Sequence, residues 1–336
     1  MNYRNLAWMS AFAFGAFLTA CSTASNTNND IKPSLKRMKC EFVPDGQEAV
    51  IYGSHLAGAD VIFPDSTSKG IRVSAAAGSN DSVLKVIVPK GSTSGKLKVI
   101  VSNDTVSSKF QFRDSRNLII DWDKKLATWG GCDPYEENEE GDHDLISSVL
   151  LDSIVKLPSA LPEGCSGVYS LVFGKYDKPW TMSHSMFLQY VANPLDGGRG
   201  DHSIAGPFDG YDVKDLALKF DVYIPKETPY KKVRTEIFFG PFDAPDKHGR
   251  DRVPICFWEP YAVSGSYSTD GWETVTIPLT EFTHTVTSYD AKFPTPIDLK
   301  KATNLTFVQF GDTTGGAGDN YIMMCVDNFR VVPISE

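Results

Sequence analysis

Apolar and polar residues alternate along much of this chain, in short runs separated by turn-forming residues. The clearest run covers residues 216–224, where every second residue is apolar. A period of two places one set of side chains on one face of a β-strand, so this run predicts a strand with one buried face. The apolar positions of the run are Leu216, Leu218, Phe220, Val222 and Ile224.

Residues 37–113 contain a regular series of such runs and predict a small β-sandwich. Turn signals such as Ala77-Gly78-Ser79-Asn80 and Pro89-Lys90-Gly91 separate the runs at the spacing typical of sandwich strands. We expect strands at residues 48–53, 59–63, 71–73, 83–88, 96–101 and 108–112.

Residues 115–336 predict a larger, aromatic-rich β domain. Its number of strands and its length suit a two-sheet jelly roll, so we expect an all-β protein with two successive sandwiches. Residues 142–157 fit either a helical face or a strand. The expected strands lie at residues 117–122, 167–173, 186–191, 216–224, 233–239, 254–258, 273–278, 305–310 and 321–332.

The first 21 residues have the pattern of a bacterial lipoprotein signal. Arg4 precedes an apolar run at residues 6–17, and Leu18-Thr19-Ala20-Cys21 follows it. The run is shorter than the roughly 20 apolar residues that a membrane-spanning helix needs. We expect cleavage before Cys21 and acylation of that cysteine, which anchors the chain to a membrane without crossing it. Residues 22–36 then form a flexible linker.

The composition supports a turn-rich β protein and excludes one class of partner. The chain has 27 Gly and 20 Pro, with a net charge of −9. This charge argues against binding to nucleic acid or to an anionic membrane surface. The basic run at residues 231–234 is best explained as a solvated strand end.

Five cysteines remain after removal of Cys21, and their spacing does not indicate a zinc site. Cys256 and Cys325 lie within apolar runs, where we expect buried thiols. Cys132 and Cys165 lie in loop-like sequence, and whether they form a disulfide stays open. None of the cysteines has the setting of a catalytic nucleophile.

Catalytic motifs are missing from the sequence. It contains no G-x-S-x-G, no H-E-x-x-H and no phosphate-binding glycine loop. Glu236 and Glu259, on neighbouring expected strands, would be the candidate pair of a glycosidase. A solvated carboxylate, or a polar contact to a ligand hydroxyl, explains each of them more simply.

Aromatic residues are the stronger functional signal, because a flat ring can stack on the apolar face of a sugar. Trp129 and Trp180 lie in loop-like sequence, where each ring either contacts a ligand or packs at a domain rim. Trp258 and Tyr261 flank Glu259 at a strand end, although a core position is an alternative for Trp258. These five residues form the predicted carbohydrate-binding site. Tyr135 and Tyr267 are secondary candidates.

The first sandwich resembles the immunoglobulin-like IPT/TIG family. Gly53-Ser54-His55-Leu56 followed by Val61-Ile62-Phe63 matches one motif of that family. Val86-Ile87-Val88-Pro89, with Gly95 and Leu97-Lys98-Val99, matches a second. This resemblance implies that the domain is a spacer.

The second sandwich resembles carbohydrate-binding jelly rolls. The matching segments are residues 271–279 (GWETVTIPL) with Phe282, residues 218–225 and residues 326–333. A lipoprotein signal, an IPT-like domain and a carbohydrate-binding jelly roll follow one another in this chain. This order resembles that of the surface glycan-binding lipoproteins of bacterial polysaccharide-utilisation systems. The resemblance implies a non-catalytic protein on the outer face of the outer membrane.

In such systems the captured polysaccharide passes to a surface endo-glycanase, and then to a TonB-dependent importer with its substrate-binding lipoprotein. No cofactor is expected. Asp327 is either a ligand of a structural calcium ion, as in some jelly rolls, or a strand-end cap. The alternative functions are a surface glycoside hydrolase or lyase, and an adhesin or assembly scaffold.

Overall fold

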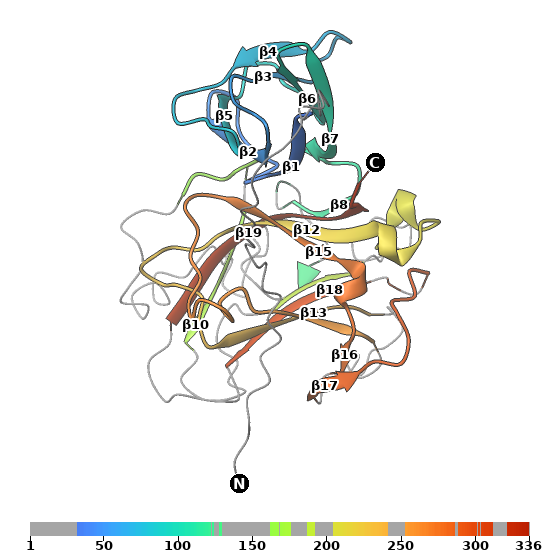
Figure 1. Ribbon diagram of the computed structural model, residues 1–336. Coiled ribbons are helices and arrows are strands. Elements are labelled where there is room, and N and C mark those ends of the chain that lie inside the picture. The colour runs from blue at the N-terminus through green and yellow to red at the C-terminus, as the bar shows by residue number, and fades with distance from the viewer. Residues whose placement is uncertain are drawn as a thin grey trace, which may run out of the picture. The chain divides into compact units, whose positions relative to one another are not determined.

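The computed structural model describes most of the chain from Lys32 onward (Figure 1). The predicted signal peptide, Cys21 and residues 22–31 of the linker lie outside the described residues, as do Trp180 and residues 142–157. No helix in the described part of the chain has the length and apolarity that spanning a bilayer requires. The structure describes residues 32–121, 123, 128–129, 162–167, 169–175, 187–191, 204–240, 253–285, 288–300, 302, 304–311 and 321–335.

The first sandwich consists of two antiparallel sheets with an immunoglobulin-like strand order. One sheet has the order β1-β2-β5 and the other has the order β4-β3-β6-β7. The chain therefore crosses between the sheets after β2, β4 and β5, and both sheets contribute to one apolar core. Its strands are β1 (Ser34–Met38), β2 (Glu48–Ser54), β3 (Asp60–Phe63), β4 (Ile71–Ser74), β5 (Val83–Ile87), β6 (Gly95–Val101) and β7 (Asp104–Phe112).

Strand β1 begins at Ser34, within the segment predicted to be a flexible linker. The prediction is wrong for residues 34–36, because they pair with β2 across a register shift between Leu35 and Arg37. This irregularity breaks the alternation that marks a strand in sequence, and the buried Leu35 and Met38 are three residues apart.

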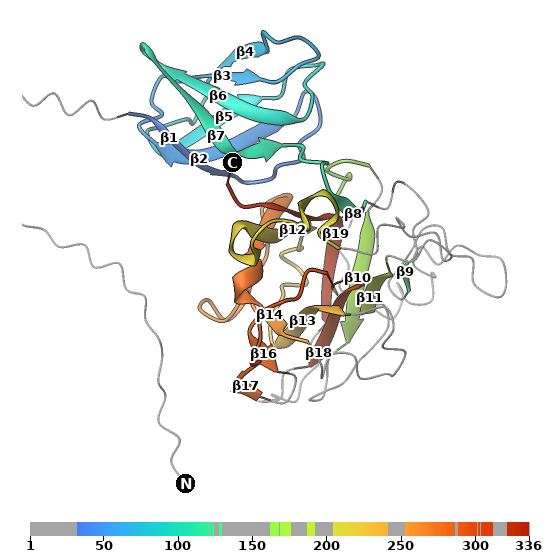
Figure 2. The ribbon, with the colours of Figure 1, turned by 90° about the vertical axis from the view of Figure 1, so that its right-hand side faces the viewer.

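The second sandwich also consists of two sheets, and the C-terminal strand lies in the middle of one of them. In this five-stranded sheet the order is β10-β19-β12-β15, and β8 pairs with β19 as well. Figure 2 shows β19 running beside β10, its antiparallel neighbour. The strands are β8 (Leu118–Ile120), β10 (Ser170–Lys175), β12 (Leu216–Tyr223), β15 (Glu273–Pro278) and β19 (Tyr321–Pro333).

The opposing sheet has seven strands among the described residues, in the order β17-β16-β14-β13-β18-β11-β9. The expected strands of both sheets are confirmed, whereas β9, β16 and β17 are too short or too polar to stand out in the sequence. The strands are β9 (Thr128–Trp129), β11 (Phe187–Val191), β13 (Val233–Gly240), β14 (Ile255–Trp258), β16 (His284–Thr285), β17 (Ser288–Lys292) and β18 (Asn304–Gly311). Short 3₁₀ turns occur at Gly206–Phe208, Val213–Asp215 and Leu279–Glu281.

One large apolar core lies between these two sheets. Phe220 is at its centre, with its ring stacked on Phe329 at 5.1 Å and edge-on to Phe307 at 5.6 Å. The alternating residues of β12 point into this core, as predicted, and are fully buried. The predicted all-β fold with two β-sandwiches is therefore confirmed.

The polar face of β12 is buried too, against the first sandwich. Lys219 Nζ lies 2.6 Å from Glu41 Oε1, and Arg330 Nη2 lies 2.8 Å from Glu41 Oε2. Arg330 Nη1 also lies 3.3 Å from Asp221 Oδ2. All four side chains are at most 5% exposed, so the junction of the two sandwiches contains a dry ion network.

Candidate functional site

The face of the seven-stranded sheet that points away from the core carries a continuous row of paired residues. Directly paired residues share one face of a sheet. Since Phe238 packs outside the main core, the row lies on what we call the outer face. The row is Trp129, Gln189, Thr306, Phe238, Ile255, His284 and Lys292, one residue from each strand from β9 to β17.

An apolar cluster lies at the middle of the outer face. Phe238, Ile255 and Val308 pack together, and Val253 and Phe257 lie against them. The cluster is separate from the core between the sheets. The sheet therefore has apolar side chains on both faces, unlike a sheet with one solvated face.

A buried ion pair lies beside this cluster. Arg234 Nη2 is 2.7 Å from Glu236 Oε1, with Arg234 4% and Glu236 0% exposed. The Arg234 guanidinium lies 4.6 Å from the centre of the Phe257 ring, and His284 packs on the same ring at 4.9 Å. The outer face thus places aromatic rings beside an ion pair. Phe257 is partly exposed, whereas Phe238, Arg234 and Glu236 are buried.

This arrangement corrects one sequence-based expectation. Arg234 is a buried partner of Glu236, so the basic run at residues 231–234 is not simply a solvated strand end. The missed signal is the alternation of β13, which places Arg234, Glu236 and Phe238 on one face. Polar residues in that pattern look solvated when the surroundings of the strand are unknown.

Trp258 does not lie on an exposed platform. It is only 9% exposed, and its ring packs on Phe220 and Tyr230, each at 5.4 Å. Trp258 pairs with Thr235 in β13 and therefore has the opposite orientation to Phe257. Of the two alternatives for Trp258, the structure supports the core position, because position 258 belongs to the inward set of β14.

The neighbours of Trp258 occupy a half-buried turn. Tyr261 packs against the core, 5.6 Å from the Tyr230 ring. The Glu259 carbonyl accepts a hydrogen bond from the Ala262 amide, which closes the turn after β14. Tyr267 donates to Glu273 Oε2 at 2.9 Å. These residues lie on the core side of the sheet edge and not in the outer-face row.

Trp129 is in strand β9 and not in a loop, and it is the end residue of the outer-face row. Trp180 and Tyr135 lie outside the described residues. Of the predicted site residues, Trp129 is therefore the one that the backbone register brings to the outer face.

The nominated carboxylate pair does not have the setting of glycosidase acids. Glu236 is fully buried, and its Oε1 lies 2.7 Å from Arg234 Nη2. A glycosidase acid must instead reach the oxygen of the glycosidic bond. Glu259 lies beyond the end of β14, in the turn described above.

Asp327 is neither a strand-end cap nor an exposed ligand. It lies inside β19, and burial raises the pKa of its carboxyl to about 8, although Ser166 donates a hydrogen bond to it at 2.9 Å. The Cys165 thiol lies 3.7 Å from the same carboxyl. This mixed oxygen and sulfur environment does not suit calcium, which binds oxygen ligands. Cys165 itself is a free thiol, and Cys132 lies outside the described residues.

The sequence of the second sandwich matches a known family. The model of the surface glycan-binding protein B xyloglucan-binding domain covers residues 112–333. The chain belongs to this family. It is therefore a glycan-binding protein of the surface type, and the sandwich that contains the outer face is the part that the family model matches.

Solved structures show the same fold. A surface glycan-binding protein from Prevotella bryantii is 18% identical, with a TM-score of 0.62 over 90% of this chain and 76% of that chain. A family member from a complex xyloglucan utilisation locus of Bacteroides uniformis is 17% identical, with a TM-score of 0.52 over 90% and 73%. A structure solved with a xylogluco-oligosaccharide is 16% identical, with a TM-score of 0.54 over 90% and 58%. No curated protein sequence matches significantly.

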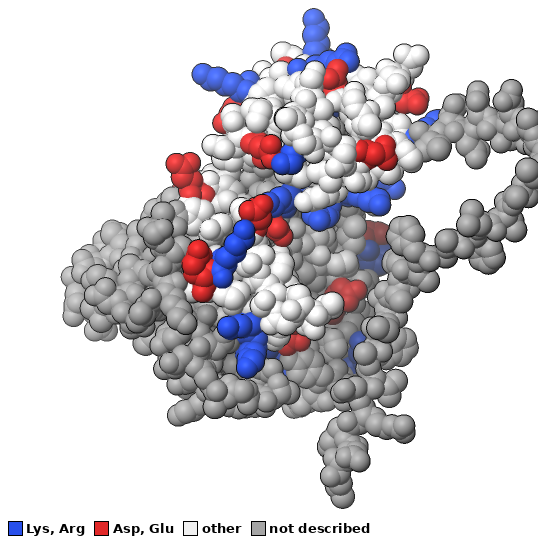
Figure 3. All heavy atoms as spheres, turned by 60° about the vertical axis from the view of Figure 1, so that its left-hand side comes forward, with Lys and Arg blue, Asp and Glu red and all other residues white. Residues whose placement is uncertain are grey.

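The distribution of charged side chains on the described surface is compatible with an uncharged ligand. Basic and acidic side chains are interspersed on the described part of the face in Figure 3, without a broad patch of one sign. Such a surface lacks the basic stripe that attracts nucleic acid.

Proposed function

We propose that the protein captures xyloglucan-like β-glucan chains on the outer face of its second sandwich. The observation behind this proposal is the outer face, where the apolar cluster with Phe238 and Phe257 and the Arg234–Glu236 pair lie within the domain that the family model matches. The printed name of the family and those of two structural relatives refer to xyloglucan or its oligosaccharides. These names support the choice of substrate class.

The proposed mechanism is stacking combined with hydrogen bonding. Phe257 and Trp129 would supply ring faces, with Trp180 as a further ring contact. The buried Arg234–Glu236 pair would hold the Phe257 ring in position for this contact. A capture protein must also release its chain, which suits dissociation constants in the micromolar to millimolar range, about −8 to −4 kcal/mol.

The proposed setting is the outer surface of the outer membrane. Acylated Cys21 would anchor the chain there, and residues 22–31 would separate the sandwiches from the bilayer. The captured glycan would then pass to a surface glycanase and to a TonB-dependent importer with its substrate-binding lipoprotein. In this setting the protein binds glycan without cleaving it.

Affinity electrophoresis in gels that contain xyloglucan, mixed-linkage glucan or mannan tests this proposal. We expect retardation by xyloglucan and a loss of affinity of about tenfold or more in Trp129→Ala and in Phe257→Ala, since tenfold corresponds to about 1.4 kcal/mol. Tyr211→Ala is the matched control, because Tyr211 is 44% exposed and lies outside the seven-stranded sheet.

Other outcomes would contradict the proposal in distinct ways. Release of new reducing ends from xyloglucan would support the glycoside hydrolase alternative. Normal migration in every gel, together with capture of a protein partner that requires the first sandwich, would support the scaffold alternative. Equal losses in Tyr211→Ala and Phe257→Ala would show that the outer face is not the site.

A further inference from the structure

Two thiols and a carboxylate from three separate segments meet at the junction of the sandwiches. Cys40 follows β1, Cys165 belongs to the segment 162–167, and Asp221 lies in β12. Their ligand atoms all lie within 4.8 Å of one another. The three residues are buried, with 5%, 4% and 0% exposure.

The spacing of these atoms resembles that of donors around a tetrahedral metal ion. Cys40 Sγ lies 3.9 Å from Asp221 Oδ1. Zinc binds sulfur at about 2.3 Å and oxygen at about 2.0–2.2 Å, so adjacent tetrahedral donors are roughly 3.5–3.8 Å apart. Asp327 Oδ2 lies 3.7 Å from Cys165 Sγ and is a further donor at the edge of the group.

Neighbouring side chains hold these donors in place. The Thr274 hydroxyl is hydrogen-bonded to Asp221 Oδ1, and Arg330 Nη1 lies 3.3 Å from Asp221 Oδ2. Asn328 Nδ2 lies 3.5 Å from Cys165 Sγ. Partners of this kind orient metal ligands and increase the affinity of a site.

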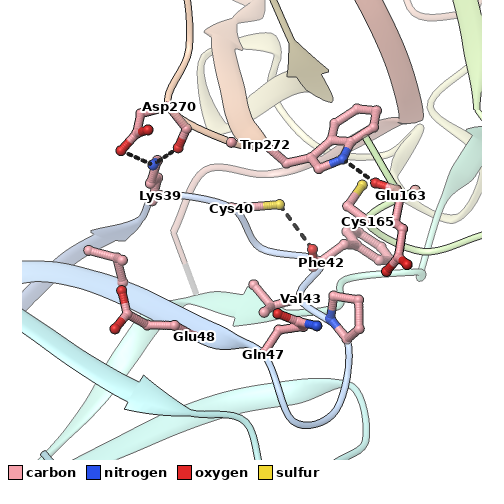
Figure 4. A pocket seen from close by; sticks show the side chains of 14 residues that line it. Lys39, Cys40, Phe42, Val43, Gln47, Glu48, Glu163, Cys165, Asp270 and Trp272 are labelled. Carbon is pink, nitrogen blue, oxygen red and sulfur yellow. Dashed lines mark hydrogen bonds and ion pairs between the residues drawn. The ribbon is translucent and has the colours of Figure 1, made fainter. Parts of the chain in front are cut away.

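A cavity of about 500 Å³ gives access to the two thiols. Cys40 and Cys165 line it together with Trp272, Glu163 and Glu48. Figure 4 shows the Cys40 sulfur hydrogen-bonded to the Phe42 carbonyl and the Cys165 sulfur near the Trp272 ring. The cavity offers an entry path for a small ion to a site that is otherwise buried.

We propose that Cys40, Cys165 and Asp221 bind one zinc ion, with Asp327 as the nearest additional ligand. Sulfur donors favour zinc over calcium or magnesium. The two thiols would release their protons as the dication enters. The Cys40 proton is the one now donated to the Phe42 carbonyl, 3.0 Å away. Lys219 and Arg330 remain paired with Glu41 when the ion binds.

Cobalt titration tests this proposal. The full chain, with Cys21→Ser and Cys132→Ser to remove thiols outside the described residues, is reduced, desalted without oxygen and titrated with Co²⁺. We expect one equivalent to bind with a thiolate-to-cobalt charge-transfer band, and zinc to displace it. Cys40→Ser and Cys165→Ser should each abolish the band and weaken zinc binding at least 100-fold.

Cys256→Ser and Cys325→Ser are the matched controls, since both are buried free thiols that lie outside this group. They should leave the band unchanged. The proposal is overturned if the reduced parent protein gives no band, or if the band persists in both Cys40→Ser and Cys165→Ser. A Cys40–Cys165 disulfide, found by peptide mapping of the protein from its native membrane, would also overturn it.

Discussion

At the scale of single residues, buried charge distinguishes this protein from a simple sandwich. Glu236 is fully buried and its described partner is Arg234, on the same strand. A buried ion pair contributes little net stability, yet removing one partner is costly, because it leaves the other charge uncompensated. Single and double substitutions should therefore behave differently.

We expect Glu236→Gln to destabilise the protein by about 3–5 kcal/mol, because the Arg234 guanidinium loses its buried carboxylate. The double variant Arg234→Met/Glu236→Leu should recover most of this loss. Urea unfolding, followed by tryptophan fluorescence, measures both. Equal destabilisation of the single and double variants would show that packing, and not charge, is what position 236 provides.

The sequence predicted the aromatic residues of the candidate site only in part. The aromatic candidates come from composition and local context, which cannot tell the two faces of a strand apart when both are apolar. Trp258 and Phe257 illustrate this, because neighbours on one strand necessarily point to opposite faces. Which face holds the core depends on the opposing sheet, far away in sequence.

At the scale of elements, strands with regular alternation were predicted well and irregular ones were not. β12 has strict alternation, and its expected span differs from the observed span by one residue. β1 was missed because of its register shift, and β9 because it has only two residues. Length also matters, since the long β19 was predicted despite the register shift in its pairing with β12.

Gly53, the first residue of the Gly53-Ser54-His55-Leu56 motif, lies where β1 and β2 approach each other closely. A Cβ at this position would overlap the Ser34 carbonyl oxygen of β1 and approach Leu56 Cδ1 to 2.9 Å. The glycine therefore permits β1 to pair closely with β2, while Leu56 fills the core beneath them.

We expect Gly53→Ala to destabilise the protein by at least about 1–3 kcal/mol, the typical cost of an added methyl group where there is no room for it. Gly210→Ala is the matched control, because a Cβ there has no neighbour within 4 Å. Hydrogen exchange should show faster exchange in β1 for the first variant alone. Unchanged protection of β1 in Gly53→Ala would contradict this account.

At the scale of the whole molecule, the two sandwiches are joined through the carboxylate of Glu41. It contacts Lys219 of β12 and Arg330 of β19 within the dry junction. These contacts lie between residues separated by most of the chain, so no local pattern indicated that the polar face of β12 is buried. The tandem order of the sandwiches was predictable, but their polar junction was not.

Replacing Glu41 by Gln should destabilise the protein by about 3–5 kcal/mol, since two buried cations lose a shared counter-charge. Glu48→Gln is the control, because the Glu48–Lys85 pair is 3.1 Å long but largely solvated and contributes less than about 1 kcal/mol. Calorimetry should show one transition for the control and separate transitions of the two sandwiches for Glu41→Gln. A single, equally shifted transition in both variants would rule out Glu41 as the coupling residue.

The position of β19 has a consequence for the time at which the protein folds. All strands of the first sandwich have been synthesised once the ribosome has passed Phe112, whereas β10 and β12 lack the strand between them until Pro333 has been synthesised. Domains generally fold as units when their chain is complete. The second sandwich therefore completes its five-stranded sheet long after the first sandwich has all its strands, so the two sandwiches become able to fold at different times during synthesis.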